Sequence, residues 1–269
     1  MRIANNVFVV TGAANGMGRQ VVLDLVRCGA RVAAVDLDEP GLAETRTLSA
    51  TTGSVSTHRV DVTDRSAVAA LPAAVTGAHG QVDGVVNIAG IIHRFAPFTE
   101  LSESETDRIM AVNFGGTVNM CRAFLPVLLE RPEANLTNMS SLSALVPFAS
   151  QTFYGASKGA VKQFSEGLYA ELRDTNVAVV TLFPGNVSTN LTGNSGVEMI
   201  DAGGRKVRAA TPEEAGEKIV DGIAKDRFRV IIGSDARALT ALSRISAAWT
   251  TSFVAKQMKS VLGPALHVS

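Results

Sequence analysis

A glycine-rich turn between a short apolar run and an amphipathic segment is the feature that most constrains the fold of this chain. Val7–Val10 is β-branched and aromatic, which predicts a buried strand. It leads directly into Thr11–Gly18, where Gly12, Gly16 and Gly18 give the spacing G-x-x-x-G-x-G, and then into an apolar helical pattern. Many glycine turns bind nothing, but a turn between a strand and a helix lets backbone N–H groups approach a pyrophosphate at the positive end of the helix. The context therefore predicts a dinucleotide-binding βα unit.

The rest of the chain repeats the alternation of strand and helix. Further strands are predicted at Arg31–Val35, Val55–Val60, Val82–Val86, Leu136–Met139, Val177–Leu182 and Val230–Gly233. Long helical patterns cover Ser102–Glu130 and Tyr154–Arg173, and Thr211, Pro212 and Glu214 form the signature of another helix start. This alternation predicts an α/β fold: a Rossmann-type doubly wound sheet of seven mainly parallel strands with helices on both faces. We expect one catalytic domain over residues 1–269.

Two segments near the C-terminus differ from this pattern. Residues 190–210 are polar and contain four glycines, and so long a loop inside a compact domain is often an active-site lid. The tail over residues 236–262 carries Leu239, Trp249 and Phe253 at helical spacing beside basic residues. It is either a basic amphipathic helix that touches a membrane surface or a helix packed on the lid or on a second subunit. We favour packing.

Charge and cysteine content exclude several classes of function. The 25 basic and 25 acidic residues cancel, which argues against a nucleic-acid partner. The chain has only two cysteines, Cys28 and Cys121, which lie far apart in sequence. Two cysteines are too few for a disulfide framework, so we expect a reduced intracellular protein. No apolar stretch reaches the length of a membrane span, and the apolar run near the N-terminus is too short for a signal peptide. We therefore expect a cytoplasmic protein.

An acidic residue ends the second predicted strand. Asp36 follows Arg31–Val35 at the place where a carboxylate bonds the adenosine ribose hydroxyls of a dinucleotide. A carboxylate there repels the 2′-phosphate of NADP, and Leu37 supplies no compensating positive charge. Asp36 therefore favours NAD; NADP is possible but disfavoured.

The segment Ser140–Gly167 contains the residues best suited to move a proton. Tyr154 and Lys158 are four apart on a predicted helix and lie on one face. A nearby ammonium stabilises a phenolate and lowers the tyrosine pKa toward neutrality, which would make Tyr154 a general base. Ser141 follows a predicted strand, so its hydroxyl can face the same point. Taken alone, the pair could equally be a solvated helix face.

Other polar and small residues stand at predicted strand ends or inside apolar patterns. Asn87 begins a run of small residues at the end of a strand, which leaves room for a ligand. Asn113 interrupts a buried helix face, so it is either satisfied in the core or functional. His93 lies in the apolar loop Ile91–Phe98 without a second ligand at metal spacing, so we interpret it as incidental and expect no metal.

With these motifs in place, the chain resembles the compact branch of the short-chain dehydrogenase/reductase family over Val7–Ser234, with Ile88 in place of the second asparagine of the family's N-N-A-G motif. The resemblance implies a catalytic tetrad of Asn113, Ser141, Tyr154 and Lys158. It also implies cofactor contacts from Gly12, Asn15, Gly16, Met17, Gly18, Asp36, Asp61, Val62, Asn87, Ala89, Gly90, Tyr154, Lys158, Pro184, Gly185, Val187 and Thr189.

The family mechanism implies that Tyr154 exchanges a proton with a substrate oxygen while hydride moves to or from the nicotinamide. Lys158 would lower the pKa of Tyr154 and hold the nicotinamide ribose, Ser141 would bond the substrate oxygen, and Asn113 would anchor a water. We expect an NAD-dependent enzyme that interconverts a secondary alcohol and a ketone on a largely apolar small molecule, and a homodimer or homotetramer. The alternative is an NAD(P)-sensing regulator without turnover. A methyltransferase would have no use for the Tyr–Lys pair.

Overall fold

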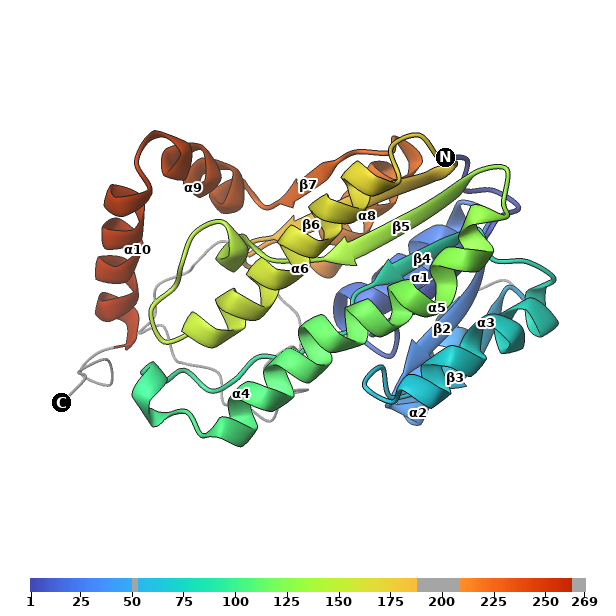
Figure 1. Ribbon diagram of the computed structural model, residues 1–269, viewed down its shortest axis with the longest axis horizontal. Coiled ribbons are helices and arrows are strands. Elements are labelled where there is room, and N and C mark those ends of the chain that lie inside the picture. The colour runs from blue at the N-terminus through green and yellow to red at the C-terminus, as the bar shows by residue number, and fades with distance from the viewer. Residues whose placement is uncertain (50–52, 188–208, 263–269) are drawn as a thin grey trace.

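The computed structural model describes residues 1–49, 53–187 and 209–262. Its centre is a seven-stranded sheet in the order β3-β2-β1-β4-β5-β6-β7, with every pair of neighbours parallel (Figure 1). The strands are β1 Val7–Thr11, β2 Arg31–Asp36, β3 Val55–Arg59, β4 Gly84–Asn87, β5 Ala134–Met139, β6 Val177–Pro184 and β7 Arg229–Ile232. The predicted fold class is confirmed.

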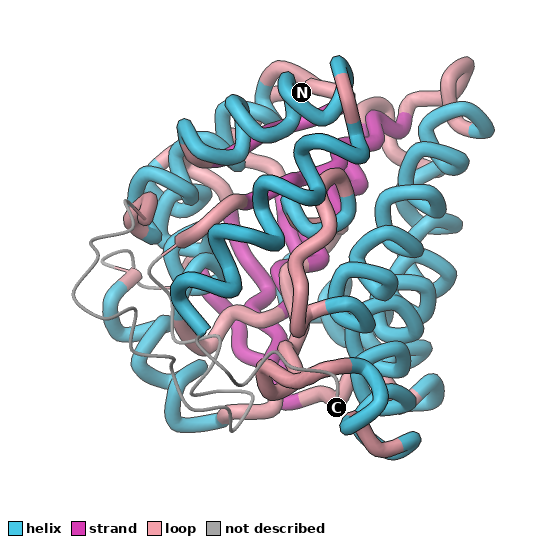
Figure 2. The backbone as a smooth tube through the Cα atoms, turned by 90° about the vertical axis from the view of Figure 1, so that its left-hand side faces the viewer, coloured by secondary structure: helices cyan, strands magenta, loops and turns pink. Residues whose placement is uncertain are grey.

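Helices cover both faces of this sheet, so that the strands lie between two helical layers (Figure 2). The first layer is α1 Gly16–Arg27, α2 Glu39–Leu48 and α8 Pro212–Ala224. The second is α3 Arg65–His79, α5 Thr117–Leu129 and α6 Thr152–Glu171, with α4 Glu103–Met110 leading into α5. Two further helices, α9 Ser234–Ile245 and α10 Ala247–Leu262, follow β7.

The apolar run in β1 serves both layers. Successive side chains of a strand point to opposite faces, and a parallel sheet is buried on both. Phe8 and Val10 accordingly pack in the core beneath α1 and α8. Val7 and Val9 pack in the core beneath α3 and α5. The first four residues of this strand are therefore all apolar, rather than apolar at alternate positions.

The strand order reverses beside β1, and this reversal locates the ligand crevice. β1 pairs with β2 on one side and with β4 on the other. The chain leaves β1 and β4 toward opposite faces, so a gap opens between the loops at their carboxyl ends. The glycine-rich turn follows β1 directly, so the first predicted βα unit lies at this gap.

Several predicted elements differ from the structure, most of them by one or two residues at their ends. The helix expected over Ser102–Glu130 is α4 and α5 joined by a π-helical segment, Ala111–Gly116. The tail is two helices rather than one. Ser246 has extended backbone angles, and its hydroxyl accepts a bond from the Trp249 N–H at 3.3 Å, so it ends α9 and caps α10. β4 begins at Gly84 rather than Val82.

The lid expected over residues 190–210 falls largely on residues 188–208, which lie outside the described part of the chain. Among the helices that the structure describes, none is both long and apolar enough to span a membrane.

Candidate active site

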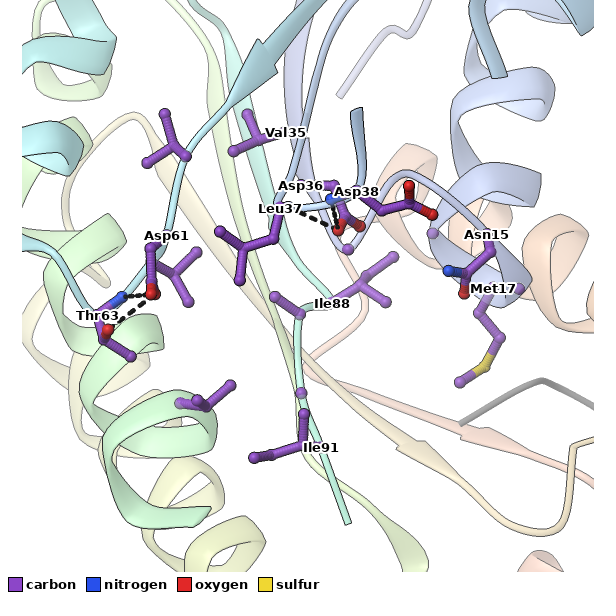
Figure 3. Close-up of a pocket in the computed structure, with 18 of the residues that line it drawn as sticks. Asn15, Met17, Val35, Asp36, Leu37, Asp38, Asp61, Thr63, Ile88 and Ile91 are labelled. Carbon is purple, nitrogen blue, oxygen red and sulfur yellow. Dashed lines mark hydrogen bonds between the residues drawn. The ribbon is translucent and has the colours of Figure 1, made fainter. Parts of the chain in front are cut away.

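A pocket of about 640 Å³ lies at the carboxyl ends of β1, β2 and β4 (Figure 3). Its wall contains many of the residues predicted to contact a cofactor. Those that line it are Gly12, Asn15, Gly16, Met17, Gly18, Asp36, Asp61, Val62, Ala89 and Gly90. Leu37, Thr63, Ile88 and Ile91 come from the same loops, and Arg108 and Val112 from the helix opposite.

The glycine turn is a backbone cradle that side chains would fill. Gly12 has φ +70°, a conformation that residues with a Cβ rarely adopt. A Cβ on Gly12 would lie 2.9 Å from the Ala89 nitrogen, and one on Gly18 would overlap the Gly12 carbonyl. The turn therefore packs as bare backbone, and the open pocket beside it can take a pyrophosphate at the start of α1. This arrangement fits a dinucleotide.

Thr11 holds the turn against the end of β4, a role that the sequence reasoning missed. Its hydroxyl accepts bonds from the backbone N–H groups of Ile88 and Ala89 at 3.0 and 3.1 Å. A threonine at the last position of a strand is the only signal in the sequence. The consequence is that the two loops lining the pocket are joined by hydrogen bonds.

Asp36 lies at one end of the pocket, within its own network of backbone bonds. Its carboxylate accepts from the N–H groups of Ala14, Leu37 and Asp38, at 3.0, 2.7 and 3.1 Å. Figure 3 shows Asp36 beside Leu37 and Asp38. Arg19, the nearest cation on α1, is bound to Glu44 at 2.6 Å and to backbone carbonyls. The residues that line this end of the pocket therefore present the carboxylates of Asp36 and Asp38, while Arg59, exposed at the end of β3, is the register partner of Asp36.

Asp61 and Val62 form the opposite wall. The Asp61 carboxylate accepts from the Thr63 N–H and hydroxyl, both at 2.8 Å (Figure 3). The Val62 carbonyl accepts from Asn119 at 3.0 Å. Gly116 of the π-helical segment lies directly against the Val62 side chain. The two predicted residues are thus fixed in place by bonds from the loop and from α5.

Asn87, also predicted to contact the cofactor, does not line the pocket. Its amide nitrogen donates to Asn138 on β5 at 2.8 Å, deep in the sheet. Pro184, Gly185 and Val187 follow β6 and are not among the lining residues; Val187 forms a parallel bridge with Ala210. Thr189 lies outside the described residues.

The four predicted catalytic residues come together beside the pocket. Lys158, only 3% exposed, donates from Nζ to the Met139 carbonyl at the end of β5, at 3.0 Å. A Cβ on Gly90, a residue of the pocket wall, would lie 3.1 Å from both the Lys158 Nζ and the Asn113 Oδ1. Lys158 and Asn113 therefore adjoin the pocket at Gly90.

Tyr154 and Ser141 complete this cluster. The Lys158 Nζ lies 6.0 Å from the centroid of the Tyr154 ring, one helical turn away. Ser141 caps the 3₁₀ turn Leu142–Ala144 by accepting the Ser143 N–H at 3.2 Å. A side-chain hydrogen bond joins Ser141 to Tyr154. The end of β5 and the first turns of α6 thus bring a hydroxyl, a phenol and an ammonium together.

Asn113 holds the loop that follows β4. It lies in the π-helical segment, where its amide accepts the Ile91 N–H at 2.8 Å and donates to the Ile91 carbonyl at 3.0 Å. It also donates to the Ser157 hydroxyl at 2.9 Å. These bonds satisfy a fully buried amide and connect the loop to α6.

Burial sets the charge states in this cluster. Burial lowers the pKa of Lys158 to about 8, because its ammonium is removed from water. Burial likewise raises the pKa of Tyr154, and only the hydrogen bond from Ser141 opposes it. The sequence predicted a lowered Tyr154 pKa, so the structure differs here. Desolvation of the phenol is the larger effect, and the ammonium is directed at a carbonyl rather than at the phenol.

Several apolar residues near the cluster are used in packing. Leu145 and Phe148 pack against a small core of Leu142, Val146, Ala236 and Val254. Phe153 stacks on Phe98 with ring centroids 6.3 Å apart. In the described part of the chain, no group of three or more His, Cys, Asp or Glu side chains is placed to hold a metal ion.

Comparison with known proteins identifies this arrangement. A family model described as short chain dehydrogenase matches residues 6–199. The chain belongs to the short-chain dehydrogenase family. An oxidoreductase-class protein of Mycobacterium tuberculosis, SadH, is 35% identical over 252 residues, which cover 89% of this chain and 90% of SadH.

Solved structures of short-chain dehydrogenases have the same fold as this chain. A short-chain dehydrogenase/reductase from Burkholderia phymatum in complex with NAD superposes with a TM-score of 0.83 at 26% identity, covering 93% of this chain and 96% of that one. A short-chain dehydrogenase from Burkholderia cenocepacia in complex with NADP gives 0.79 at 25% identity, covering 94% and 99%. The family thus includes binders of either dinucleotide, and this chain is an oxidoreductase of that family.

The buried Lys158 ammonium should make the protein less stable than its core alone would allow. Its pKa falls from 10.5 to about 8 on folding, so the unfolded chain binds more protons between these values and stability rises with pH across that window. Lys158→Met should therefore raise the free energy of unfolding by roughly 1–2 kcal/mol at pH 7, and the gain should shrink as the pH approaches 10.5. Urea denaturation across this pH range measures it.

Lys162→Met is the matched control, because Lys162 lies one turn further along α6 in a partly exposed pair with Glu166 at 3.0 Å. It should change stability by no more than about 0.5 kcal/mol. If Lys158→Met is less stable than the wild type at pH 7, the buried Lys158 ammonium does not destabilise the folded protein and the prediction is wrong.

Proposed function

We propose that the protein is an NAD-dependent dehydrogenase or reductase that interconverts a secondary alcohol and a ketone, with Tyr154 as the general acid and base. The observation that carries the proposal is the convergence of Ser141, Tyr154 and Lys158 at the end of β5, beside a pocket whose glycine cradle fits a dinucleotide.

The cofactor would be held by the lining of the pocket: the glycine turn for the pyrophosphate, Asp36 for the adenosine ribose, and Asp61 with Val62 for the adenine. Lys158 would hold the nicotinamide ribose. When bound, the nicotinamide supplies or accepts hydride. Asp36 and Asp38 at the adenosine end support NAD over NADP, because a 2′-phosphate would meet carboxylate charge there.

The protein's own residues manage the proton. Tyr154 would donate its phenolic proton to the oxygen of a ketone as that oxygen becomes an alkoxide, and would take the proton back from an alcohol. Ser141, bonded to Tyr154, would hold the same oxygen and stabilise its charge. Burial keeps Tyr154 protonated at neutral pH, so reduction has its acid ready, whereas oxidation needs the phenolate and is favoured at higher pH.

The substrate would be largely apolar. The loop Ile91–Phe98 contributes Ile91 to the pocket lining, and Ile92 and Phe95 of the same loop are half-buried. This apolar loop supports a lipid-like or cyclic alcohol. A cytoplasmic location agrees with two unpaired cysteines.

We further propose a homodimer through α5 and α6. An apolar hollow of about 310 Å³ lies between these helices, lined by Val118, Cys121, Arg122, Leu125, Pro126, Leu129, Phe164 and Leu168. Leu129 is 41% exposed there. An apolar face of this kind on two long helices supports self-association about a two-fold axis.

Tyr154→Phe should bind NADH with an affinity within about threefold of the wild type but lose at least a hundredfold in turnover, because only the proton donor is removed. A panel of secondary alcohols and ketones, read by NADH absorbance, identifies a substrate, and oxidation should accelerate as the pH rises. Tyr169→Phe is the control: Tyr169 lies on the same helix and packs on Phe228. Undiminished turnover in Tyr154→Phe would remove the proposed acid and base.

Calorimetric titration should show NADH binding at least tenfold more tightly than NADPH, about 1.4 kcal/mol. Asp36→Asn should narrow this preference, because it removes the charge while keeping an acceptor. Asp174→Asn, in the exposed turn before β6 and outside the pocket lining, should leave it unchanged. Tighter binding of NADPH by the wild type would sink the role given to Asp36.

Leu129→Glu should halve the mass measured by light scattering if α5 and α6 pair, because it buries a charge in the interface. Leu48→Glu, at a comparably exposed leucine on α2, should leave the mass unchanged. A wild-type protein that is monomeric at micromolar concentration would refute the proposed dimer.

A further inference from the structure

His93, interpreted from the sequence as an incidental loop histidine, contacts the start of the helix that carries Tyr154. It is only 4% exposed. Its Nδ1 lies 2.7 Å from the Arg94 carbonyl, and its Nε2 accepts the backbone N–H of Tyr154 at 3.2 Å. Its own carbonyl accepts from the Gln151 amide at 3.1 Å. Two of these three bonds join His93 to the start of α6, and the third holds the ring within its own loop.

These contacts fix the form of the imidazole. A carbonyl can only accept, so Nδ1 carries the proton and donates to Arg94. A backbone N–H can only donate, so Nε2 must be unprotonated to accept from Tyr154. His93 is therefore neutral, in the Nδ1–H form. In a doubly protonated ring, the Nε2–H would face the Tyr154 N–H, and this hydrogen bond would be lost.

The start of α6 lacks the usual internal cap. In most helices the N-cap side chain accepts the N–H of the third helical residue. Here the N-cap is Gln151, which makes no such bond and instead donates to the His93 carbonyl. The third residue is Tyr154, and its N–H is taken by His93. His93, 61 positions away in the sequence, therefore supplies the missing cap. The N–H that it accepts belongs to Tyr154, the proposed acid and base.

We propose that neutral His93 is a positioning residue for Tyr154, and that its protonation releases the start of α6 and sets an acid limit on turnover. This inference rests on the proposed function, in which Tyr154 exchanges the proton. The loop is held from both sides: Asn113 bonds Ile91, and His93 bonds α6. Loss of the cap therefore moves the tyrosine relative to Ser141 and Lys158 rather than the loop as a whole.

The charges that face His93 agree with this role. Burial, the largest effect, lowers the pKa of His93, and Arg94 lowers it further; the bond to the Arg94 carbonyl and the charge of Glu105 on α4 oppose this. Arg94 is itself paired with Glu105 at 3.0 Å and with Glu100 at 3.8 Å. At the start of α6, the residues that contact His93 are Gln151 and Tyr154, and both are uncharged. A protonated His93 would also place positive charge at the positive end of the helix.

The sign of the pH effect follows. The pKa of His93 is lower in the folded protein than its ordinary 6.5, so its neutral form is complete above 6.5. Both the cap and its contribution to stability are lost as the pH falls through the lowered value. Turnover by the wild type should decline across the same interval.

The test measures kcat and KM against pH for the wild type, His93→Gln, His93→Phe and the control His79→Gln. Glutamine keeps an acceptor at the reach of Nε2 but does not titrate, so it should retain kcat within about threefold and lose the acid decline. Phenylalanine keeps the ring without the acceptor, so kcat should fall about tenfold with KM for NADH unchanged. His79 is equally buried, with a pKa also lowered by burial, but bonds Ser56 far from the site.

The outcomes separate this inference from the proposed function. An acid decline that is the same in the wild type, His93→Gln and His79→Gln would overturn the role of His93, while loss of turnover in Tyr154→Phe would still support the function. Wild-type kcat in His93→Phe would also overturn it. Full turnover by Tyr154→Phe would overturn the function and this inference with it.

Nitrogen NMR of ¹⁵N-histidine-labelled protein gives a readout that does not depend on turnover. The signals missing from His93→Gln belong to His93. They should show the Nδ1–H form at pH 7 and titrate below 6.5. An Nε2–H form, or titration at or above that value, would refute the proposal.

Discussion

The bond between the Lys158 ammonium and the Met139 carbonyl joins the chemistry of this protein to its sheet. A parallel sheet gathers the carboxyl ends of its strands at one edge, and β5 ends there with β4 between it and the strand that leads into the glycine turn. By bonding that strand end, Lys158 fixes the register of α6 against the edge. Tyr154, one turn earlier on α6, is thereby directed at Ser141. An isolated helix bearing the same residues would have no such reference point.

The features that the sequence predicted well are those with local or periodic signals. Apolar strands such as Val7–Val10 and caps such as Thr211 with Glu214 depend on neighbours within a few positions. The family resemblance then placed Tyr154, Lys158, Ser141 and Asn113 in one cluster, although their separations in the chain carry no geometry. This is why the fold class and the four-residue cluster were accessible before the structure.

The missed features depend on contacts between distant segments. Nothing near His93 indicates that it caps a helix starting at Thr152, because that helix approaches only once the sheet has formed. The amide of Asn87, a predicted cofactor contact, donates to Asn138 because of the register of β4 on β5, and the sequence did not indicate this partner. The Tyr154 pKa depended on burial, which a four-residue spacing does not report. The break at Ser246 was missed because a serine is as common on the surface of a helix as at its cap, so the sequence does not tell the two apart.

The π-helical segment has a consequence for how this chain can vary. It accommodates one more residue per turn than the helices on either side, and it carries Asn113 inward and Gly116 against Val62. Deleting one residue there would restore a regular helix and leave α5 close to its present rotation on α4, because the wider turn already absorbs the extra residue. Phe124 and Leu128 would then stay in the core beneath the sheet. The extra residue therefore matters for where Asn113 and Gly116 lie, and losing it would disturb the site rather than the packing of α5.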